Sequence, residues 1–288
     1  MEHLRKYRPS IPLLILLSLT VYLAIWSFRL APAPPYLKVV FLDVGQGDAI
    51  YIEAPNGKQM LIDGGPDAKL LSSLAKVMPF ADRSLDVVIE THPDTDHIGG
   101  LPILLDNYQV GQIFENGAKA DSAIYNLLEE KITKNKIDKV IARRGQRIIL
   151  DPTRNIYFDI LFPDRDVSKL ESNDGSIVGK LVYGKNSFLL TGDATLYTEN
   201  QIEWQESKEN LKSDVLKLGH HGSKTSSSLL WLEAVKPSLV IISAGLHNKY
   251  GHPSPEIMAR LSALHIPFLS TADLGNIIFE SDGLNLMH

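Results

Sequence analysis

The sequence predicts an α/β fold in which two β-sheets pack together with helices on their outer faces. Two observations indicate this fold. A run of short strand-like segments is followed by alternating helices and strands, and this order occurs twice along the chain. The chain has 288 residues, of which 44% are hydrophobic, which is enough to bury a large core and excludes a disordered protein.

The first half of the fold begins as a β-meander. Glycine and asparagine residues separate three short apolar runs, the pattern of strands joined by tight turns. Helical periodicity then alternates with one buried apolar run. The expected strands are 37–42, 49–53, 60–62 and 85–89, and the expected helices are 69–77, 101–107 and 124–134.

The second half repeats this order, with four strand-like runs before helical patterns return. The expected strands are 147–150, 156–162, 177–183, 187–191, 215–218, 239–242 and 277–280, and the expected helices are 196–205, 229–235 and 255–264.

The amino-terminal segment differs in character. Residues 11–28 carry no charge and span about 27 Å as a helix, close to the hydrocarbon thickness of a bilayer. Arg5, Lys6 and Arg8 precede this run, which predicts a single-pass membrane anchor with a cytoplasmic amino terminus and an extracytoplasmic domain. Residues 1–34 would then comprise a basic end, the anchor and a Pro-rich spacer, and 35–288 the domain. A cleaved signal peptide is the alternative interpretation.

Composition restricts the chemistry. The chain contains no cysteine, which excludes disulfides and thiolate metal sites, so a metal would need oxygen and imidazole ligands. The formal net charge is −5 at pH 7 although the amino-terminal segment is basic, so the remainder is acidic and not an obvious polyanion binder.

The stretch "ETHPDTDHIGG" concentrates charge after the expected strand 85–89. It places His92, Asp94, Asp96 and His97 within six positions, followed by a glycine pair. Like charges this close repel unless a cation lies between them. A solvated acidic loop is the alternative interpretation of this motif taken alone.

Three other apolar strands also end in a glycine-adjacent aspartate or histidine. "LIDGGPD" contains Asp63, "FLLTGDA" contains Asp193, and "DVLKLGHHGSKTSSS" contains His220 and His221. Such ligands must converge from several strand ends, so the repeated pattern predicts a metal site. Two divalent cations and one hydroxide would balance the three carboxylates of Asp94, Asp96 and Asp193, with Zn²⁺ or Mn²⁺ as the candidate ions.

Seven stretches taken together resemble the metallo-β-lactamase superfamily, and within it the hydrolase domains of ComEC-type competence proteins. They are "FLDVGQGDAIYI", "LIDGG", "THPDTDHIGGL", "NDGSIVGKLVYG", "FLLTGDA", "LKLGHHGS" and "NKYGHPSP". The likeness runs from about Leu37 to Ser281. It implies a four-layer αββα sandwich with a dinuclear metal site at one edge.

The resemblance also implies roles for individual residues. His92 and Asp94 would bind one metal, while Asp96, His97 and a histidine after the second strand would bind the other, with Asp193 bridging. Either His220 or His221 could be that histidine, and His220 is the expected ligand because it comes first after its strand. Asp63 would support the metal loop by hydrogen bonds, and Asn173 stands near where many members carry a histidine. The expected catalytic residues are Asp96, His221 and His252; His252 is interpreted as a ligand, an acid for the leaving group or a turn-capping residue.

Two further segments are candidates for substrate binding. Ser223, Lys224 and Thr225 precede a helix and could bind a phosphate, or the segment could be an ordinary helix cap. Residues 131–147 form a basic strip that could follow a phosphate backbone, face anionic lipid or remain a solvated surface.

Three functions follow as hypotheses. The first is a membrane-anchored, metal-dependent phosphodiesterase acting on DNA, in DNA uptake or processing. The second is a hydrolase of a small ester, a lactone or a cell-envelope phosphodiester. The third is a non-catalytic metal-binding subunit that works beside a separate DNA-transport channel.

Overall fold

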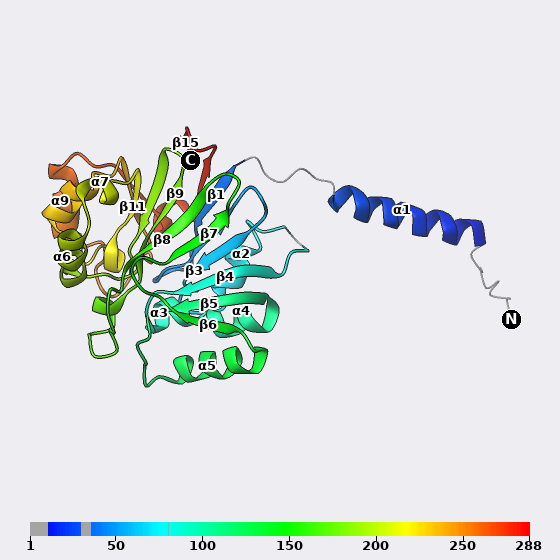
Figure 1. Cartoon of the computed structure of the whole chain (residues 1–288), viewed down its shortest axis with the longest axis horizontal. Helices are drawn as coiled ribbons and strands as arrows, with labels where there is room; N and C mark the ends of the chain where they lie inside the picture. Colours follow the sequence, from blue (N-terminus) through cyan, green and yellow to red (C-terminus); the bar gives the residue numbers. More distant parts are fainter. Residues whose placement is uncertain (1–10, 30–35, 80) are drawn as a thin grey trace.

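The computed structural model describes residues 11–29, 36–79 and 81–288 and consists of two mixed β-sheets with helices (Figure 1). The predicted α/β fold with two sheets is therefore confirmed.

The first sheet is built from strands of both ends of the chain. They are β1 (Leu37–Phe41), β2 (Ile50–Glu53), β3 (Gln59–Ile62), β4 (Ser84–Glu90), β5 (Gln109–Glu115), β6 (Asp138–Ile141), β14 (Ile277–Ser281) and β15 (Leu286–Met287). Their order is β15-β14-β1-β2-β3-β4-β5-β6. The predicted meander is the antiparallel part, β1 to β3, and β3 to β6 pair in parallel.

The second sheet contains the strands of the second half of the chain. They are β7 (Arg147–Asp151), β8 (Ile156–Phe162), β9 (Val178–Tyr183), β10 (Asn186–Leu190), β11 (Val215–Lys217), β12 (Leu239–Ile242) and β13 (Phe268–Ser270). Their order is β13-β12-β11-β10-β9-β8-β7, with β10 to β13 parallel.

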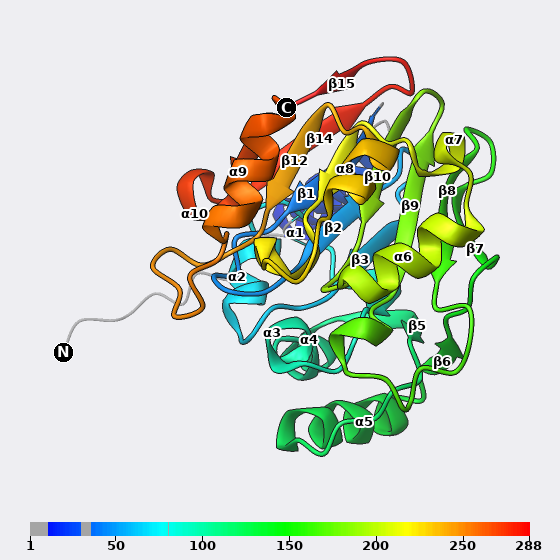
Figure 2. The same ribbon diagram turned by 90° about the vertical axis from the view of Figure 1, so that its left-hand side faces the viewer.

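Helices cover the outer faces of the two sheets (Figures 1 and 2). The first sheet packs on α2 (Lys69–Leu74), α3 (Thr95–Ile98), α4 (Leu101–Asn107) and α5 (Ala123–Asn135). The second packs on α6 (Leu196–Gln205), α7 (Lys208–Leu211), α8 (Leu229–Val235) and α9 (Pro255–Ala263), and α10 (Thr271–Leu274) follows β13.

A third apolar core lies between the sheets and holds them together. At its centre the ring of Phe279 meets those of Phe41 and Phe188 edge to face, at centroid distances of 5.9 and 5.6 Å. Burying each such side chain stabilises the fold by about 1.5–3 kcal/mol. The three cores together define the layers that the sequence predicts.

Four strands, β5, β6, β13 and β15, were not predicted. β5 contains Gly111, and β6 lies inside the basic strip, so neither reads as an apolar run. Parallel pairing with β4 fixes β5, and a Cβ at position 111 would lie 2.7 Å from the carbonyl oxygen of Asp86. Tertiary pairing therefore overrides weak local strand preference here.

The amino-terminal helix is present as α1 (Ile11–Arg29). In the described part of the chain no helix is both long and apolar enough to cross a membrane, so the predicted transmembrane anchor is not supported. The basic residues Arg5, Lys6 and Arg8 and the Pro-rich spacer lie outside the described residues. The extracytoplasmic location stays a prediction.

The parallel strands of both sheets bring their carboxyl ends to one edge. In register, Ile62 of β3 lies beside Ile89 of β4, and Lys217 of β11 lies beside Ile241 of β12. Loops that leave such strand ends meet over a common crevice, where ligands of α/β folds bind. The predicted site residues are all on these loops or just beyond them.

Glu199 of α6 fixes one of these loops, the segment between β11 and α8. Its buried carboxylate accepts the backbone N–H groups of Ser227 and Ser228, the latter at 3.0 Å. Burial raises the pKa of Glu199 to about 7, although these N–H groups oppose the rise. The loop that carries His220 and His221 therefore depends on the protonation state of a buried carboxyl group.

We predict that Glu199→Gln removes part of the pH dependence of stability. The pKa in the folded chain, about 7, exceeds the ordinary value of 4.5, so the folded state binds more protons between these pH values. The Glu199 contribution is full below pH 4.5 and is lost as the pH rises through 7. It amounts to about 3 kcal/mol of unfolding free energy.

Urea denaturation at pH 5 and pH 8 measures this loss. The exposed Glu209→Gln variant is the control and should keep the wild-type difference. An identical pH dependence in Glu199→Gln and the wild type would contradict the assignment.

Candidate metal centre

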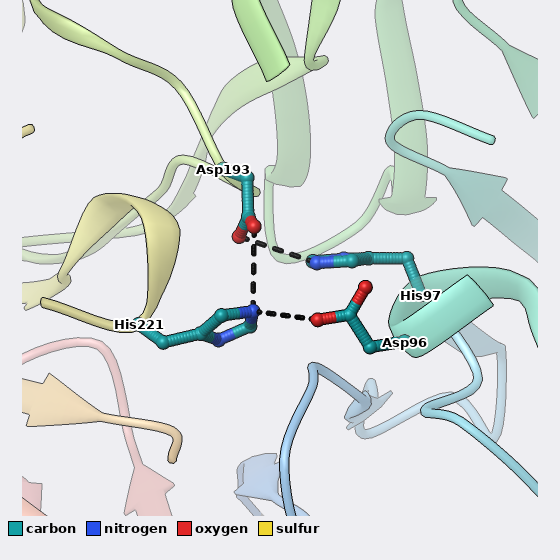
Figure 3. A group of neighbouring side chains, drawn as sticks. All are labelled: Asp96, His97, Asp193 and His221. Atoms are coloured by element: carbon teal, nitrogen blue, oxygen red, sulfur yellow. Dashed lines mark ion pairs between the residues drawn. The ribbon is translucent and has the colours of Figure 1, made fainter. Parts of the chain in front are cut away.

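Four side chains converge at the edge where the two sheets meet (Figure 3). Asp96 and His97 come from α3, Asp193 follows β10, and His221 follows β11. His97 Nε2 lies 3.2 Å from Asp193 Oδ1, and His221 Nε2 lies 3.3 Å from both Asp193 Oδ2 and Asp96 Oδ2. One ligand atom from each residue lies within 4.8 Å of the others, so the group can hold one metal ion.

His97 is oriented by Asp63, as the sequence predicts for that aspartate. His97 Nδ1 donates to Asp63 Oδ2 at 2.8 Å, and the same carboxylate accepts the backbone N–H and the hydroxyl of Thr91, both at 2.8 Å. A hydrogen bond at Nδ1 fixes the ring and leaves Nε2 directed at the cluster. Asp63 is fully buried, so water does not compete for this contact.

His221 is held in the same way. Its Nδ1 donates to the carbonyl oxygen of Ser243 at 2.9 Å, and its Nε2 faces Asp96 and Asp193. The ring is 1% exposed. This arrangement is the usual support of a metal-binding histidine.

His220, the ligand expected from the sequence, takes a different position from His221. Its Nε2 lies 3.9 Å from Asp193 Oδ2, and it is not in the compact group. Both histidines adopt left-handed backbone angles, φ 47° and 54°, and this turn directs the rings apart. Being first after the strand therefore does not make His220 the inner residue; His221 occupies that place.

The other predicted ligands lie at the edge of the cluster. His92 is fully buried, with Nε2 3.7 Å from Asp94 Oδ2. The Asp94 side chain is 43% exposed and accepts the Ser172 hydroxyl at 2.6 Å. Asn173 Nδ2 lies 3.3 Å from His220 Nε2. These residues are close enough to contribute to a second ion, but only Asp96, His97, Asp193 and His221 form the compact group.

Electrostatics in the cluster follow from burial and opposite charge. Burial opposes a charged His97, yet the carboxylates of Asp193 and Asp63 outweigh it and raise the pKa of His97 well above its ordinary value. His221 shows the same balance with Asp193 and Asp48. Burial and the neighbouring His97 lower the pKa of His92 to about 3, so its ring is neutral. A cation is therefore the natural partner of the carboxylates, and a neutral His92 suits a ligand role.

The donor set fits a divalent metal. His92 Nε2, His97 Nε2 and His221 Nε2 are buried and form no hydrogen bond of acceptable geometry, and neither does Asp193 Oδ1. Unpaired buried polar atoms are costly and need an explanation. Imidazole nitrogen and carboxylate oxygen are ligands for Zn²⁺ and Mn²⁺. One ion would satisfy His97, His221 and Asp193, and His92 would need a second.

A buried ion pair next to the cluster was missed in the sequence. The ammonium group of Lys217 contacts the Asp48 carboxylate, donates to the Gly192 carbonyl oxygen at 3.0 Å and lies 3.8 Å from Asp193 Oδ1. Lys217 is fully buried. Burial opposes ionisation of Asp48, but Lys217 together with His221 and His97 outweighs it and holds the pKa of Asp48 below its ordinary value. The sequence feature that could have indicated this pair is Lys217 itself, a single lysine within an apolar strand.

The Lys217–Asp48 pair joins the two sheets, because Asp48 lies in the loop between β1 and β2. Gly47 permits the loop to approach: its φ is +122°, and a Cβ there would lie 2.1 Å from the backbone oxygen of Asp96. The backbone N–H of Asp48 also donates to that oxygen at 3.3 Å. The pair therefore positions α3 and β11 relative to each other beneath the cluster.

A small cavity of about 140 Å³ opens over the cluster. Its walls include Gln46, Asn173, His220, Tyr250 and His252. Burial and then His220 lower the pKa of His252, which favours a neutral ring. His252 thus lies at the mouth of the site rather than among the closest metal-binding groups.

The predicted phosphate-binding segment is engaged within the protein. Ser223 is buried and its hydroxyl lies 2.9 Å from that of Thr225, while Lys224 and Thr225 are exposed. Glu199 already occupies the N–H groups of Ser227 and Ser228, and Ser228 caps α8 through Trp231 N at 3.0 Å. The alternative interpretation, an ordinary helix cap, agrees with this geometry.

Four of the seven basic residues of the strip form ion pairs with carboxylates of the same chain. Lys131 pairs with Asp106, Lys139 with Glu115 and Glu129, Arg144 with Glu206, and Arg147 with Asp159, at distances between 2.5 and 2.8 Å. These partners come from distant positions, so the sequence alone did not show them. A continuous track for a phosphate backbone is therefore not evident here.

Comparison with known proteins identifies the family. Residues 42–245 match the metallo-β-lactamase superfamily domain. The chain therefore belongs to the metallo-β-lactamase superfamily and is a hydrolase of that fold. The novel metallo hydrolase Igni18 of Ignicoccus hospitalis shares the fold, with a TM-score of 0.53 and 17% identity over 85% of this chain and 99% of that chain.

Three relatives in sequence bear names linked to competence or recombination. ComE operon protein 3 of Bacillus subtilis is 31% identical over 84% of this chain. Recombination protein 2 of Haemophilus influenzae is 32% identical over 92%, and competence protein ComA of Neisseria gonorrhoeae 29% identical over 84%. The chain spans only 31–33% of the length of these proteins. The resemblance to competence proteins found in the sequence is confirmed.

We predict that His221→Ala and His220→Ala separate the two histidines. Loss of His221 removes a ligand of the compact group, so the affinity for Zn²⁺ or Mn²⁺ should fall by more than about 100-fold, since even the partners of metal ligands contribute about 10- to 100-fold. His220→Ala should change it by less than about 10-fold. Isothermal titration calorimetry measures both, and the reverse order would contradict the assignment.

We also predict that Lys217→Met destabilises the chain by about 3–5 kcal/mol, because it leaves the buried Asp48 carboxylate without its ammonium partner. Adding Asp48→Asn should recover part of the loss, since both charges are then removed. Urea denaturation in the presence of a chelator measures the cycle. Additive effects of the two substitutions would show that the pair is not coupled.

Proposed function

We propose that this member of the metallo-β-lactamase superfamily is a metal-dependent phosphodiesterase that cleaves DNA. The observation that carries the proposal is the cluster of Asp96, His97, Asp193 and His221 beside a polar cavity. In this cluster His97 Nε2, His221 Nε2 and Asp193 Oδ1 are buried and form no hydrogen bond. The competence and recombination names of the relatives favour nucleic acid as the substrate.

The chain's own residues would hold the metal and orient the phosphate. A divalent ion, when bound, supplies Lewis acidity and an activated water for attack on phosphorus. Asp193 contacts both His97 and His221, so its carboxylate would be a ligand shared with both histidines. A second ion would draw on His92 and Asp94, and either Zn²⁺ or Mn²⁺ suits these ligands.

Neutral donors surround the place where phosphate oxygens would lie. Gln46 Oε1 accepts the N–H of Gly245 at 3.1 Å, and this bond leaves its amide nitrogen available. Asn173, His220 and His252 line the same cavity. Such groups can donate hydrogen bonds to a substrate phosphate and to its leaving oxygen.

The second candidate, a hydrolase of a small ester, lactone or cell-envelope phosphodiester, has two observations in its favour. The internally paired basic strip and the small cavity suit a compact substrate as well as a nucleic acid chain. A role beside a separate DNA-transport channel is a further proposal, which the competence names of two relatives favour.

We predict that the purified chain cleaves labelled single- or double-stranded DNA in the presence of Mn²⁺ or Zn²⁺. Asp193→Asn should lower the rate by at least about 100-fold because it removes a shared ligand. Asp159→Asn, which removes a carboxylate paired with Arg147 away from the centre, is the control.

A panel of esters, lactones and small phosphodiesters runs in parallel with the DNA substrates. Turnover of a small ester but of no nucleic acid would replace the nuclease by the second candidate. Metal uptake without turnover of any substrate would support a non-catalytic metal-binding subunit.

A further inference from the structure

We propose that the loop of residues 245–252 is a nucleobase-binding rim beside the metal centre. Tyr250 would stack on an unpaired base next to the phosphate in the cavity, and Lys249 would contact a neighbouring phosphate. The inference rests on the proposed phosphodiesterase function and narrows its substrate to single-stranded nucleic acid.

The first observation is a row of rings that leads outward from the centre. His220 and His252 meet edge to face at 5.5 Å, and His252 stacks with Tyr250 at 5.8 Å with 21° between the ring planes. Tyr250 lines the cavity and is 56% exposed. A large aromatic side chain at a polar site, left open to solvent, is the usual platform for stacking a base.

The second observation is that the loop is cross-linked by one side chain. Asn248 Oδ1 accepts the backbone N–H groups of Tyr250 at 3.2 Å and His252 at 3.0 Å. Its Nδ2 donates to the carbonyl oxygens of Gly245 at 2.9 Å and His252 at 2.5 Å. The platform is therefore pre-organised, which reduces the entropy lost on binding.

The third observation is the charge on the rim. Lys249 Nζ lies 5.0 Å from the centroid of the Tyr250 ring. Within the described ranges, no carboxylate lies at ion-pair distance from Lys249, in contrast to the paired residues of the basic strip. A cation beside an exposed aromatic ring is the combination that single-strand binding sites use to hold backbone and base together.

The size of the cavity determines where a base would lie. Pockets that enclose drug-sized ligands measure about 300–1,000 Å³, whereas this cavity measures about 140 Å³. It has room for a phosphate-sized group but not for a whole nucleoside. The base must then lie outside, at the rim, and it can reach Tyr250 only when it is not stacked within a duplex.

The test compares a labelled single-stranded oligonucleotide with an abasic oligomer that has the same number of phosphates. Both Kd, from fluorescence anisotropy with Mn²⁺, and cleavage rate are measured on the full chain. The wild type should prefer the base-bearing strand by about 5- to 100-fold. Tyr250→Ala should bring this ratio towards one, and Tyr250→Phe should keep it. Tyr197→Ala, at a partly exposed tyrosine of α6, is the matched control.

The outcomes distinguish this inference from the proposed function. If the chain cleaves DNA but Tyr250→Ala does not change its preference for the base-bearing strand, the proposed rim is wrong and the proposed phosphodiesterase function stands. If the chain binds the base-bearing strand more tightly but cleaves no DNA, the proposed rim stands and the proposed nuclease function is wrong. A wild type that neither binds nor cleaves DNA would overturn both.

Salt dependence tests the part of Lys249. In Lys249→Gln the slope of log Kd against log salt should decrease by about 0.7, the value for one charge on a single strand. An unchanged slope would show that Lys249 does not contact a phosphate of the bound strand.

Discussion

The arrangement of this protein depends on the need of a buried group of carboxylates for positive charge. Asp96 and Asp193 come from different sheets, yet they lie on either side of His221 Nε2 at equal distances of 3.3 Å. Carboxylates brought this close are unfavourable unless protonated imidazoles or a cation lie between them. The same carboxylates raise the pKa values of His97 and His221, because they stabilise the protonated imidazoles. A metal ion supplies this positive charge and leaves the fewest buried polar atoms unpaired.

The surrounding fold can be understood as the structure that holds these groups in place. Parallel strands of both sheets end at one edge, Asp63 and the Ser243 carbonyl group fix the two histidine rings, and the Lys217–Asp48 pair joins the sheets below them. Each contact is buried, so water does not compete for it. The mouth differs, since Tyr250 and Lys249 there are exposed and the loop is fixed mainly by the side chain of Asn248.

Much of this could be predicted from the sequence, for physical reasons that also explain the failures. Apolar runs placed α8 and β12 correctly, and the aspartates and histidines at strand ends indicated the cluster. What depended on the path of the backbone could not be predicted. Left-handed angles at His220 and His221 decide which ring faces inward, and the partners of the basic strip come from distant elements. Likewise, the carboxylate of Glu199, on the separate helix α6, accepts backbone N–H groups of the segment 223–228 that the sequence suggested for phosphate binding.

The most direct measurement is a crystal structure of the chain grown with Zn²⁺ or Mn²⁺, with anomalous data collected at the absorption edge of the metal. The account predicts a peak between the two sheets, with His221 Nε2 and Asp193 about 2.0–2.2 Å from it when the ion is zinc. His97 and Asp96 should complete the coordination, and His220 should lie outside it. A cluster without any anomalous peak, or an ion bound by His220 while His221 remains outside, would contradict the account.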